Sequence, residues 1–277
     1  LANERRAFFR RTFVDEATGK TICSWYDAER KGQLIDTQTS YALPLAFHVV
    51  DGDLQKKMAA HLAAAIKTPM AGYPAYSLLT GFIGTAWISK ALSDNGMSEE
   101  AYRLLQYEGY PSWLYPVKNG ATTIWERLNS YTVKDGFGEN NSMNSFNHYS
   151  FGAVASWMYN YSLGICRDEK SPGFKHFILK PEVDPTRGIT HAEGYYDSMY
   201  GRISSRWQYT DSGIRYEFTV PANTTASLYL PAPAVSFISE NGKPLKKASG
   251  VRYVSADKEL HHLELASGSY QFDIKQK

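Results

Sequence analysis

The stretch Ser171-Pro-Gly-Phe-Lys-His-Phe-Ile-Leu179 marks the point at which the chain changes its residue pattern. After it, short runs rich in β-branched and aromatic residues recur with a period of two, which is typical of half-buried strands. The runs cover residues 174–179, 203–209, 214–220, 227–230, 235–238, 263–265 and 270–274. The turn sequences Asp211-Ser-Gly213 and Asn241-Gly242 favour hairpins between such strands. This spacing of short strands predicts an antiparallel β-sandwich over residues 171–277.

Before this stretch, apolar residues recur at the spacing of an amphipathic helix. In residues 54–67 they return every three or four positions, and Pro69 follows the run. The apolar face of this helix comprises Leu54, Met58, Leu62 and Ala65. Further helical runs cover residues 41–50, 81–92, 101–107 and 147–163. Asp36 or Thr37 is expected to cap the run at 41–50, and Gly164 the run at 147–163. Because no strand-helix-strand repeat is visible, we expect paired helices over residues 1–170 and not a parallel sheet.

The composition excludes several classes of protein. With 30 Lys and Arg against 28 Asp and Glu, the net charge of +2 is too small for the field that nucleic acid binding needs. No apolar run approaches the roughly 18 residues of a membrane span. Two cysteines allow one disulfide bridge at most, and neither a structural zinc site nor a cofactor is expected. The aromatic content of 14% favours carbohydrate, because rings stack on the C–H faces of sugars.

The densest polar and aromatic stretch lies between residues 107 and 151, in loops that join the late helices. Within it, Glu126 lies between Trp125 and Arg127 and is either a general base or half of a local ion pair. His148 either contacts a ligand or caps and packs a helix start. Residues 135–139 only faintly resemble a calcium loop, because the alternating ligands of such loops are missing. Packing or surface roles are expected for His191, His261 and His262, and no nucleophilic role for Cys23 or Cys166.

The segment Gly120-Ala-Thr-Thr-Ile-Trp-Glu-Arg127 resembles the signature of the α-L-rhamnosidases of glycoside hydrolase family 78. Segments similar to the family's other motifs follow in the family's order, at residues 36–43, 81–85, 110–113 and 145–149. Three weaker segments, at 223–226, 241–242 and 268–272, resemble the β-domain that follows the family's catalytic barrel. The resemblance therefore extends over nearly the whole chain.

The resemblance implies a partial (α/α)6 barrel followed by an antiparallel β-sandwich, and inverting hydrolysis of terminal α-L-rhamnose residues. It implies that Glu126 is the general base that deprotonates the attacking water. It also makes His148 a sugar-contacting residue, and Trp125 and Trp113 walls of the sugar site. The implied partner is a rhamnose-containing glycoside or polysaccharide, with no metal and no cofactor.

One departure from the family is serious, because inversion needs two carboxyl groups roughly 6.5–9.5 Å apart. The acidic motif that carries the family's general acid does not occur before Glu126. Four carboxylates could be proposed in place of the general acid: Asp36, Glu108, Asp135 and Glu139. None of them matches the family's acid motif. The barrel also has twelve helices, of which about six or seven can be placed before residue 170. We therefore expect a C-terminal part of a larger enzyme that is inactive alone, and that needs its N-terminal half or a dimer partner.

Two other interpretations stay open. One is a different (α/α)6 sugar hydrolase or lyase, acting on another sugar or on a uronic acid. The other is a non-catalytic module that binds carbohydrate or serves a structural role. The sequence leaves cytoplasmic, periplasmic and secreted locations all possible, because we expect no signal segment in this chain.

Overall fold

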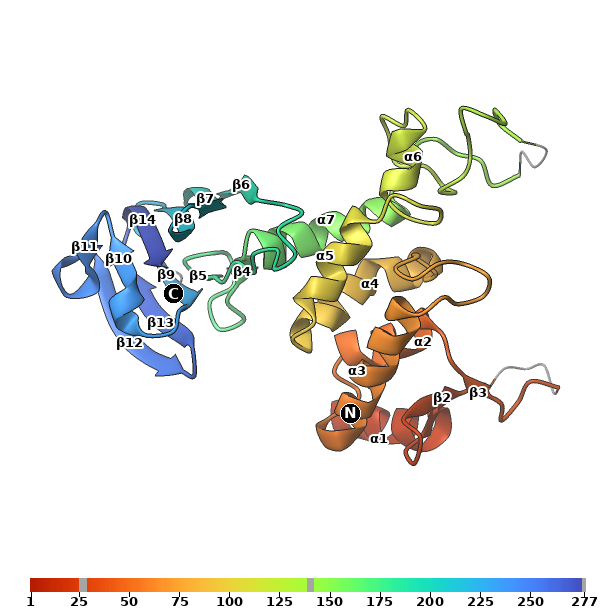
Figure 1. Cartoon of the computed structure of the whole chain (residues 1–277). Coiled ribbons are helices and arrows are strands. Elements are labelled where there is room, and N and C mark those ends of the chain that lie inside the picture. Colours follow the sequence, from red (N-terminus) through yellow and green to blue (C-terminus); the bar gives the residue numbers. More distant parts are fainter. Residues whose placement is uncertain (25–28, 139–141, 276–277) are drawn as a thin grey trace. The chain divides into compact units, whose positions relative to one another are not determined.

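The computed structural model describes residues 1–24, 29–138 and 142–275. It consists of two compact units, Leu1–Val154 and Ala155–Lys277, which are described separately. The first unit is mainly helical and the second is built of strands (Figure 1). The sequence prediction of a domain border between residues 170 and 171 stays a prediction.

Paired helices form the frame of the first unit. Its helices are α1 (Ala2–Phe13), α2 (Gln38–Ala46), α3 (Gly52–Lys67), α4 (Gly81–Asp94), α5 (Ser98–Gln106) and α6 (Leu114–Lys118). Helix α2 packs against α3 and α4, and α4 also contacts α5, so that α2 to α5 lie side by side (Figure 1). The helices predicted over residues 54–67, 81–92 and 101–107 are thus confirmed.

Helix α3 buries the face that its sequence pattern predicts. Leu54, Met58 and Leu62 are all buried, and Met58 and Leu62 have no exposed surface. Each such side chain contributes about 1.5–3 kcal/mol by leaving water. Ala65 on the same face is also buried, which lets the neighbouring helix approach closely.

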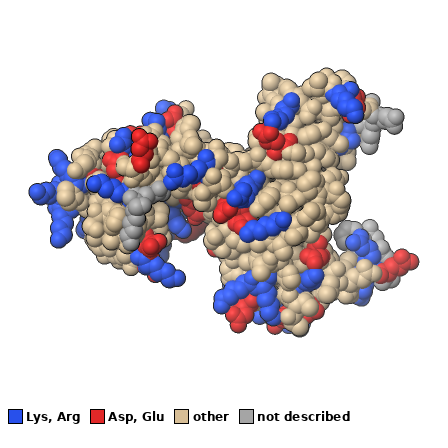
Figure 2. Space-filling model, viewed as in Figure 1, with Lys and Arg blue, Asp and Glu red and all other residues tan. Residues whose placement is uncertain are grey.

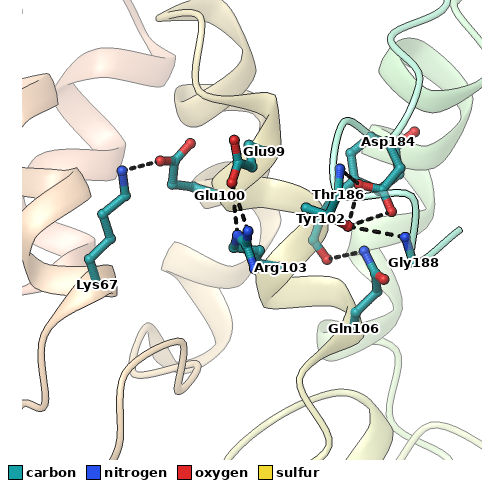
Figure 3. A network of polar contacts seen from close by, with 9 residues as sticks. All are labelled: Lys67, Glu99, Glu100, Tyr102, Arg103, Gln106, Asp184, Thr186 and Gly188. Carbon is teal, nitrogen blue, oxygen red and sulfur yellow. Dashed lines mark hydrogen bonds and ion pairs between the residues drawn. The ribbon is translucent and has the colours of Figure 1, made fainter.

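Ion pairs join α3 to α5 and brace α5 itself (Figure 3). The ammonium of Lys67, in the last turn of α3, pairs with the carboxylate of Glu100 in the first turn of α5. Glu100 is almost completely buried, and its hydrogen bond raises the pKa of Lys67 above the ordinary value. One turn on, Arg103 Nη2 lies 2.9 Å from Glu99 Oε1.

The start of α2 corrects one sequence interpretation. Thr37 is the N-cap, and its hydroxyl accepts a hydrogen bond from the Ser40 amide at 3.2 Å in a capping box. Asp36 is therefore not the cap. Its carboxylate instead pairs with Lys20 and accepts a hydrogen bond from the Tyr41 hydroxyl at 2.7 Å.

Some elements of the first unit have no clear sequence signal. A small antiparallel sheet is formed by β1 (Val14–Asp15), β2 (Lys20–Ile22) and β3 (Leu34–Ile35). The helix expected over residues 147–163 begins later and changes its winding along its length. It runs as a 3-10 turn at Ser150–Ala153, as α7 at Val154–Trp157 and as a π turn at Met158–Ser162. Gly164 ends it with a φ of +70°, as its expected role as a C-cap requires.

The second unit is a β-sandwich of a six-stranded and a five-stranded sheet. The six-stranded order is β11-β10-β14-β8-β7-β6, and the five-stranded order is β12-β13-β9-β5-β4. The strands are β4 (Ile165–Arg167), β5 (His176–Leu179), β6 (His191–Ser198), β7 (Gly201–Thr210), β8 (Gly213–Val220), β9 (Thr225–Pro231), β10 (Ile238–Glu240), β11 (Lys243–Pro244), β12 (Val251–Asp257), β13 (Leu260–Leu265) and β14 (Gly268–Lys275).

Pairing follows the antiparallel prediction with one exception, since β5 and β9 run parallel. The predicted turns at 211–213 and 241–242 join β7 to β8 and β10 to β11. The strand expected over residues 235–238 is wrong for most of its length, because Val235–Phe237 forms a 3-10 turn and β10 begins at Ile238.

The core of the second unit lies between its sheets, where alternate strand residues point inward. Trp207, Tyr216 and Phe272 have no exposed surface. The Trp207 indole donates to the Ser162 carbonyl at 2.8 Å, and the Ser205 hydroxyl to the Leu163 carbonyl at 2.6 Å. These bonds fix the end of the late helix to β7.

The surface carries both signs of charge. Lys and Arg side chains are interspersed with Asp and Glu over the face seen in Figure 2, in keeping with the small net charge. Across the part of the chain that the structure describes, no helix is both long and apolar enough to cross a membrane.

Candidate functional site

Two separate loop segments of the first unit, residues 123–126 and 145–148, pair with each other through hydrogen bonds. The Glu126 amide donates to the Ser145 carbonyl at 2.8 Å, and the His148 amide donates to the Ile124 carbonyl at 2.9 Å. The Thr123 hydroxyl bonds the Phe146 carbonyl between them. The segment 123–126 is therefore held against 145–148, which brings the two residues predicted to carry the chemistry into one local structure.

The carboxylate of Glu126 is positioned by the same pairing. Its Oε2 atom accepts a hydrogen bond from the Ser145 amide at 2.9 Å, and the side chain keeps partial access to solvent. Arg127 Nη2 is directed to Asn144 Oδ1 at 3.5 Å. Glu126 and Arg127 are thus each hydrogen-bonded to the segment 144–145, and the choice between a general base and a local ion pair stays a prediction.

The imidazole of His148 is held by aromatic rings. Phe82, from the first turn of α4, stacks on it with ring centroids 4.7 Å apart, and Tyr149 does so at 5.7 Å. Phe82 also makes an edge contact with Phe151 at 5.5 Å. Helix α4 thus reaches the paired loops through one aromatic side chain, and His148 stays partly exposed.

The two tryptophans predicted as walls of the site are mostly covered. Trp113 is 8% exposed and Trp125 is 6% exposed. The Trp113 indole donates to the Phe151 carbonyl at 2.8 Å, while Trp125 packs edge-on against Phe146 at 5.1 Å. Both rings therefore support the loops that carry Glu126 and His148. Their contact with a sugar stays a prediction.

Sequence reasoning missed two aromatic residues of this site. Phe82 contacts His148 from a helix far away in the chain, and no local pattern links the two. Tyr149 is one of the most exposed aromatic residues of the described chain and lies next to His148. The sequence did contain one signal, a tyrosine next to the candidate sugar contact His148, while the exposure of its ring is visible only in the structure.

Three of the four carboxylates considered as substitute acids lie in the described part of the chain, and each has contacts outside the paired loops. Burial raises the pKa of Asp36, but hydrogen bonds from Lys20 and Tyr41 outweigh that effect and leave the pKa below its ordinary value. Glu108 pairs with Lys118, and both are exposed. Asp135 is exposed in a turn, where its amide donates to the Thr132 hydroxyl at 2.9 Å.

Glu139, the last of the four, lies outside the described residues, and so does the end of the faint calcium-like segment at 135–139. Among residues 1–24, 29–138 and 142–275, no group of three or more His, Cys, Asp or Glu side chains is arranged to hold a metal ion.

The remaining histidines and cysteines serve packing or lie at the surface. His191 is exposed on β6, whereas His261 is buried and contacts the Ala232 carbonyl at 3.1 Å. His262 Nε2 lies 2.9 Å from Glu264 Oε1. Cys23 and Cys166 form no disulfide, and the Cys166 thiol donates to the Asn160 carbonyl at 2.9 Å.

Comparisons with known proteins cover both units. Residues 1–162 match the family described as the bacterial alpha-L-rhamnosidase 6 hairpin glycosidase domain. Residues 164–244 match the bacterial alpha-L-rhamnosidase C-terminal domain.

Among curated proteins, the chain is 35% identical over 248 residues to an alpha-L-rhamnosidase of Streptomyces avermitilis, an alignment that covers 90% of this chain and 22% of that protein. It is 34% identical over 241 residues to one of an Alteromonas species, covering 86% of this chain and 24% of the relative. The chain thus spans about a quarter or less of the length of these relatives.

Solved structures give the same result. The Streptomyces avermitilis alpha-L-rhamnosidase complexed with L-rhamnose aligns over 98% of this chain and 23% of its own, with a TM-score of 0.79 and 32% identity. The alpha-L-rhamnosidase of Dictyoglumus thermophilum aligns over 98% of this chain and 28% of its own, with a TM-score of 0.77 and 25% identity.

Proposed function

Because the chain belongs to the bacterial α-L-rhamnosidase family, we propose that it is part of a glycoside hydrolase that removes terminal non-reducing α-L-rhamnose from a glycoside or polysaccharide. Support comes from the pairing of 123–126 with 145–148, which gathers Glu126 and His148 in one loop structure. The fold agrees with this proposal, since a helical unit precedes a β-sandwich in the order of the two matched domains.

We assign Glu126 the role of general base in an inverting reaction. Its carboxylate takes a proton from a water molecule while the water oxygen attacks the anomeric carbon on the face opposite the leaving group. A base has to be held in one orientation to do this, and the Ser145 amide holds Glu126 Oε2 at 2.9 Å. The partial exposure of Glu126 leaves room for water and sugar.

His148 and the rings around it are proposed to form part of the rhamnose site. An imidazole nitrogen hydrogen-bonds to a sugar hydroxyl, and the stack on Phe82 fixes the direction of that nitrogen. Trp113 and Trp125 are proposed as walls of this site, because apolar rings suit the C5 methyl group of rhamnose.

The general acid is proposed to come from outside this chain. A catalytic acid needs a protonated carboxyl at the working pH, which usually means a raised pKa. Asp36 has a lowered pKa, and Glu108 is paired with Lys118. If the acid is supplied from outside, the chain alone should show negligible hydrolysis of an aryl α-L-rhamnoside.

The test compares this chain with the longer protein of which we propose it is a part. The longer protein should release β-L-rhamnose first, seen by proton NMR, because inversion changes the anomeric configuration of an α-glycoside. Glu126→Gln should abolish this turnover without changing the melting temperature. Normal kcat in Glu126→Gln would overturn the assignment of the base, and turnover by the isolated chain would overturn the missing acid.

A panel of aryl glycosides separates the other enzymatic interpretation from this one. If another glycoside is turned over faster than the rhamnoside, the substrate assignment is wrong. Saturable rhamnose binding by the longer protein without any turnover would instead favour a binding module.

A further inference from the structure

The outer face of the six-stranded sheet contains a cavity that the proposed hydrolysis does not use. Its volume is about 600 Å³, within the range of small-molecule sites. Its lining comes from four strands and the turn after β10, and includes Tyr195, Ser204, Arg206, Glu217, Asn241 and Gln271. All of these residues belong to the second unit, far along the chain from Glu126.

Strand register lines up the hydroxyl groups of this face. Tyr195 lies opposite Ser204, Ser204 opposite Thr219, and Thr219 opposite Ser269. Cross-strand partners point to the same side of a sheet, so these residues form one row across four strands. Gln271, which lies two residues after Ser269 on β14 and points to the same side, adds a side-chain amide to the cavity.

The ring of Tyr195 is held in a fixed position. The guanidinium carbon of Arg202 lies 3.7 Å from the ring centroid. Asp197 in turn holds Arg202, through Arg202 Nε to Oδ1 at 2.8 Å and Nη2 to Oδ2 at 3.1 Å. Tyr195 is still 49% exposed, so a large part of a fixed aromatic surface remains open to a ligand.

The charged side chains that line the cavity balance one another. Arg206 lies between Glu193 and Glu217, at 3.5 Å and 3.4 Å. With Arg202, two guanidinium groups and two carboxylates line the cavity, and Arg202 is itself paired with Asp197. This arrangement disfavours an anionic ligand. The buried Nε atom of Arg206 is the one that lies 3.5 Å from Glu193 Oε2, so this ion pair is part of the floor of the cavity.

We propose that this cavity binds a neutral saccharide, with a sugar ring stacked on Tyr195 and its hydroxyls on Ser204, Thr219 and Gln271. A fixed ring beside a row of hydroxyl and amide groups matches the two kinds of surface that a sugar presents, its C–H face and its hydroxyls. The saccharide would be bound and not cleaved there. This site does not depend on Glu126, so it stands or falls separately from the proposed hydrolysis.

Titration calorimetry of the full chain tests the site, with L-rhamnose, cellotetraose and trigalacturonate as probes. At least one of the two neutral probes should bind saturably. Tyr195→Ala should weaken that binding at least ten-fold, Tyr195→Phe should retain it, and Thr219→Val should weaken it about three-fold. Tyr159→Ala is the matched control, because Tyr159 is 42% exposed in the same unit and lies outside the cavity.

The variant Glu126→Gln separates this site from the proposed catalytic one. Binding that survives in Glu126→Gln and is lost in Tyr195→Ala, with an unchanged melting temperature, supports the site on the sheet. Three outcomes would overturn it: no binding of either neutral probe, binding that Tyr195→Ala leaves intact, or tighter binding of trigalacturonate than of both neutral probes.

Discussion

Phe82 stacks on the imidazole of His148, with ring centroids 4.7 Å apart and planes inclined by 29°. Phe82 belongs to helix α4, whereas His148 lies in the loop paired with the Glu126 segment. The position of a proposed sugar contact is therefore set by a packed helix as well as by its own loop.

Phe82→Leu should weaken sugar binding and change the chemical step less. Loss of the stack frees the His148 ring, so in the longer protein we expect KM for an aryl rhamnoside to rise about three- to ten-fold. Steady-state kinetics separate KM from kcat. Phe47→Leu is the control, because Phe47 packs on Trp87 at 4.6 Å in the same unit. An equal rise in KM for both variants would contradict a specific role for Phe82.

Ser145→Pro should lower kcat by about ten- to a hundred-fold, because proline has no N–H to hold Glu126 Oε2. Ser145→Ala keeps the amide and should retain most of the activity. Initial rates at saturating substrate check both variants, and circular dichroism confirms that they fold. If Ser145→Pro is folded and fully active, the Ser145 amide does not position the base.

The pair of Lys67 and Glu100 should give the first unit a stability that depends on pH. The hydrogen bond that Lys67 donates to Glu100 raises the pKa of Lys67 in the folded chain. The stabilisation is therefore present below the unfolded pKa and is lost as the pH rises through the folded value. We expect Lys67→Met to cost about 0.5–1 kcal/mol at pH 7, since Lys67 is itself half exposed. Urea unfolding at pH 7 and above pH ~10.4 measures this, and the difference between wild type and variant should shrink at the higher pH.

Asp36 should make the stability of the chain depend on pH at the acidic end of the scale. Its folded pKa is lowered, so its contribution is present above the unfolded value of about 3.9 and is lost as the pH falls through the folded value. Asp36→Asn should destabilise the chain by about 1 kcal/mol at pH 7 and flatten the acid side of the stability curve. Urea titrations at several acidic pH values measure the free energy of unfolding of both proteins. If this free energy falls equally with pH in wild type and Asp36→Asn, Asp36 does not have this role.

Gly164→Ala should be among the most destabilising single substitutions in the second unit. Gly164 has a φ of +70°, and a Cβ atom there would lie 2.1 Å from the Pro181 nitrogen. We expect a loss above about 3 kcal/mol, read from thermal unfolding. Gly242→Ala is matched in backbone, with a φ of +73° and no neighbour within 4 Å, and should lose only about 1 kcal/mol. Similar losses in both variants would show that crowding at Gly164 is unimportant.

Much of the architecture follows from the sequence wherever burial imposes a period. Helix α3 and strands β7, β8 and β14 are examples, since each buries one regular face. Strands β6 and β12 are exposed along most of their length, so no apolar alternation marks them. Helix α1 has no buried residue, so it lacks the periodic apolar face from which a helix is predicted.

For the candidate site, the motif around Glu126 and the residue His148 are visible in the sequence, but their supports are not. The bond from Ser145 to Glu126 joins segments that only the folded loop brings together. The stack of Phe82 on His148 and the bond from Trp113 to the Phe151 carbonyl depend on tertiary packing in the same way. No local spacing rule predicts such contacts.

The place of β14 in the six-stranded sheet sets the order in which the second unit can fold. β14 follows the other five strands of this sheet in the sequence, yet it lies between β10 and β8 in the sheet. Until residues 268–275 are synthesised, β8 and β10 have no partner along those edges, and unpaired edges invite pairing with other chains. During synthesis this sheet can therefore be completed only after β14 has been made. A premature stop before Gly268 would leave β11-β10 and β8-β7-β6 as two separate parts, each with an unpaired edge prone to aggregation.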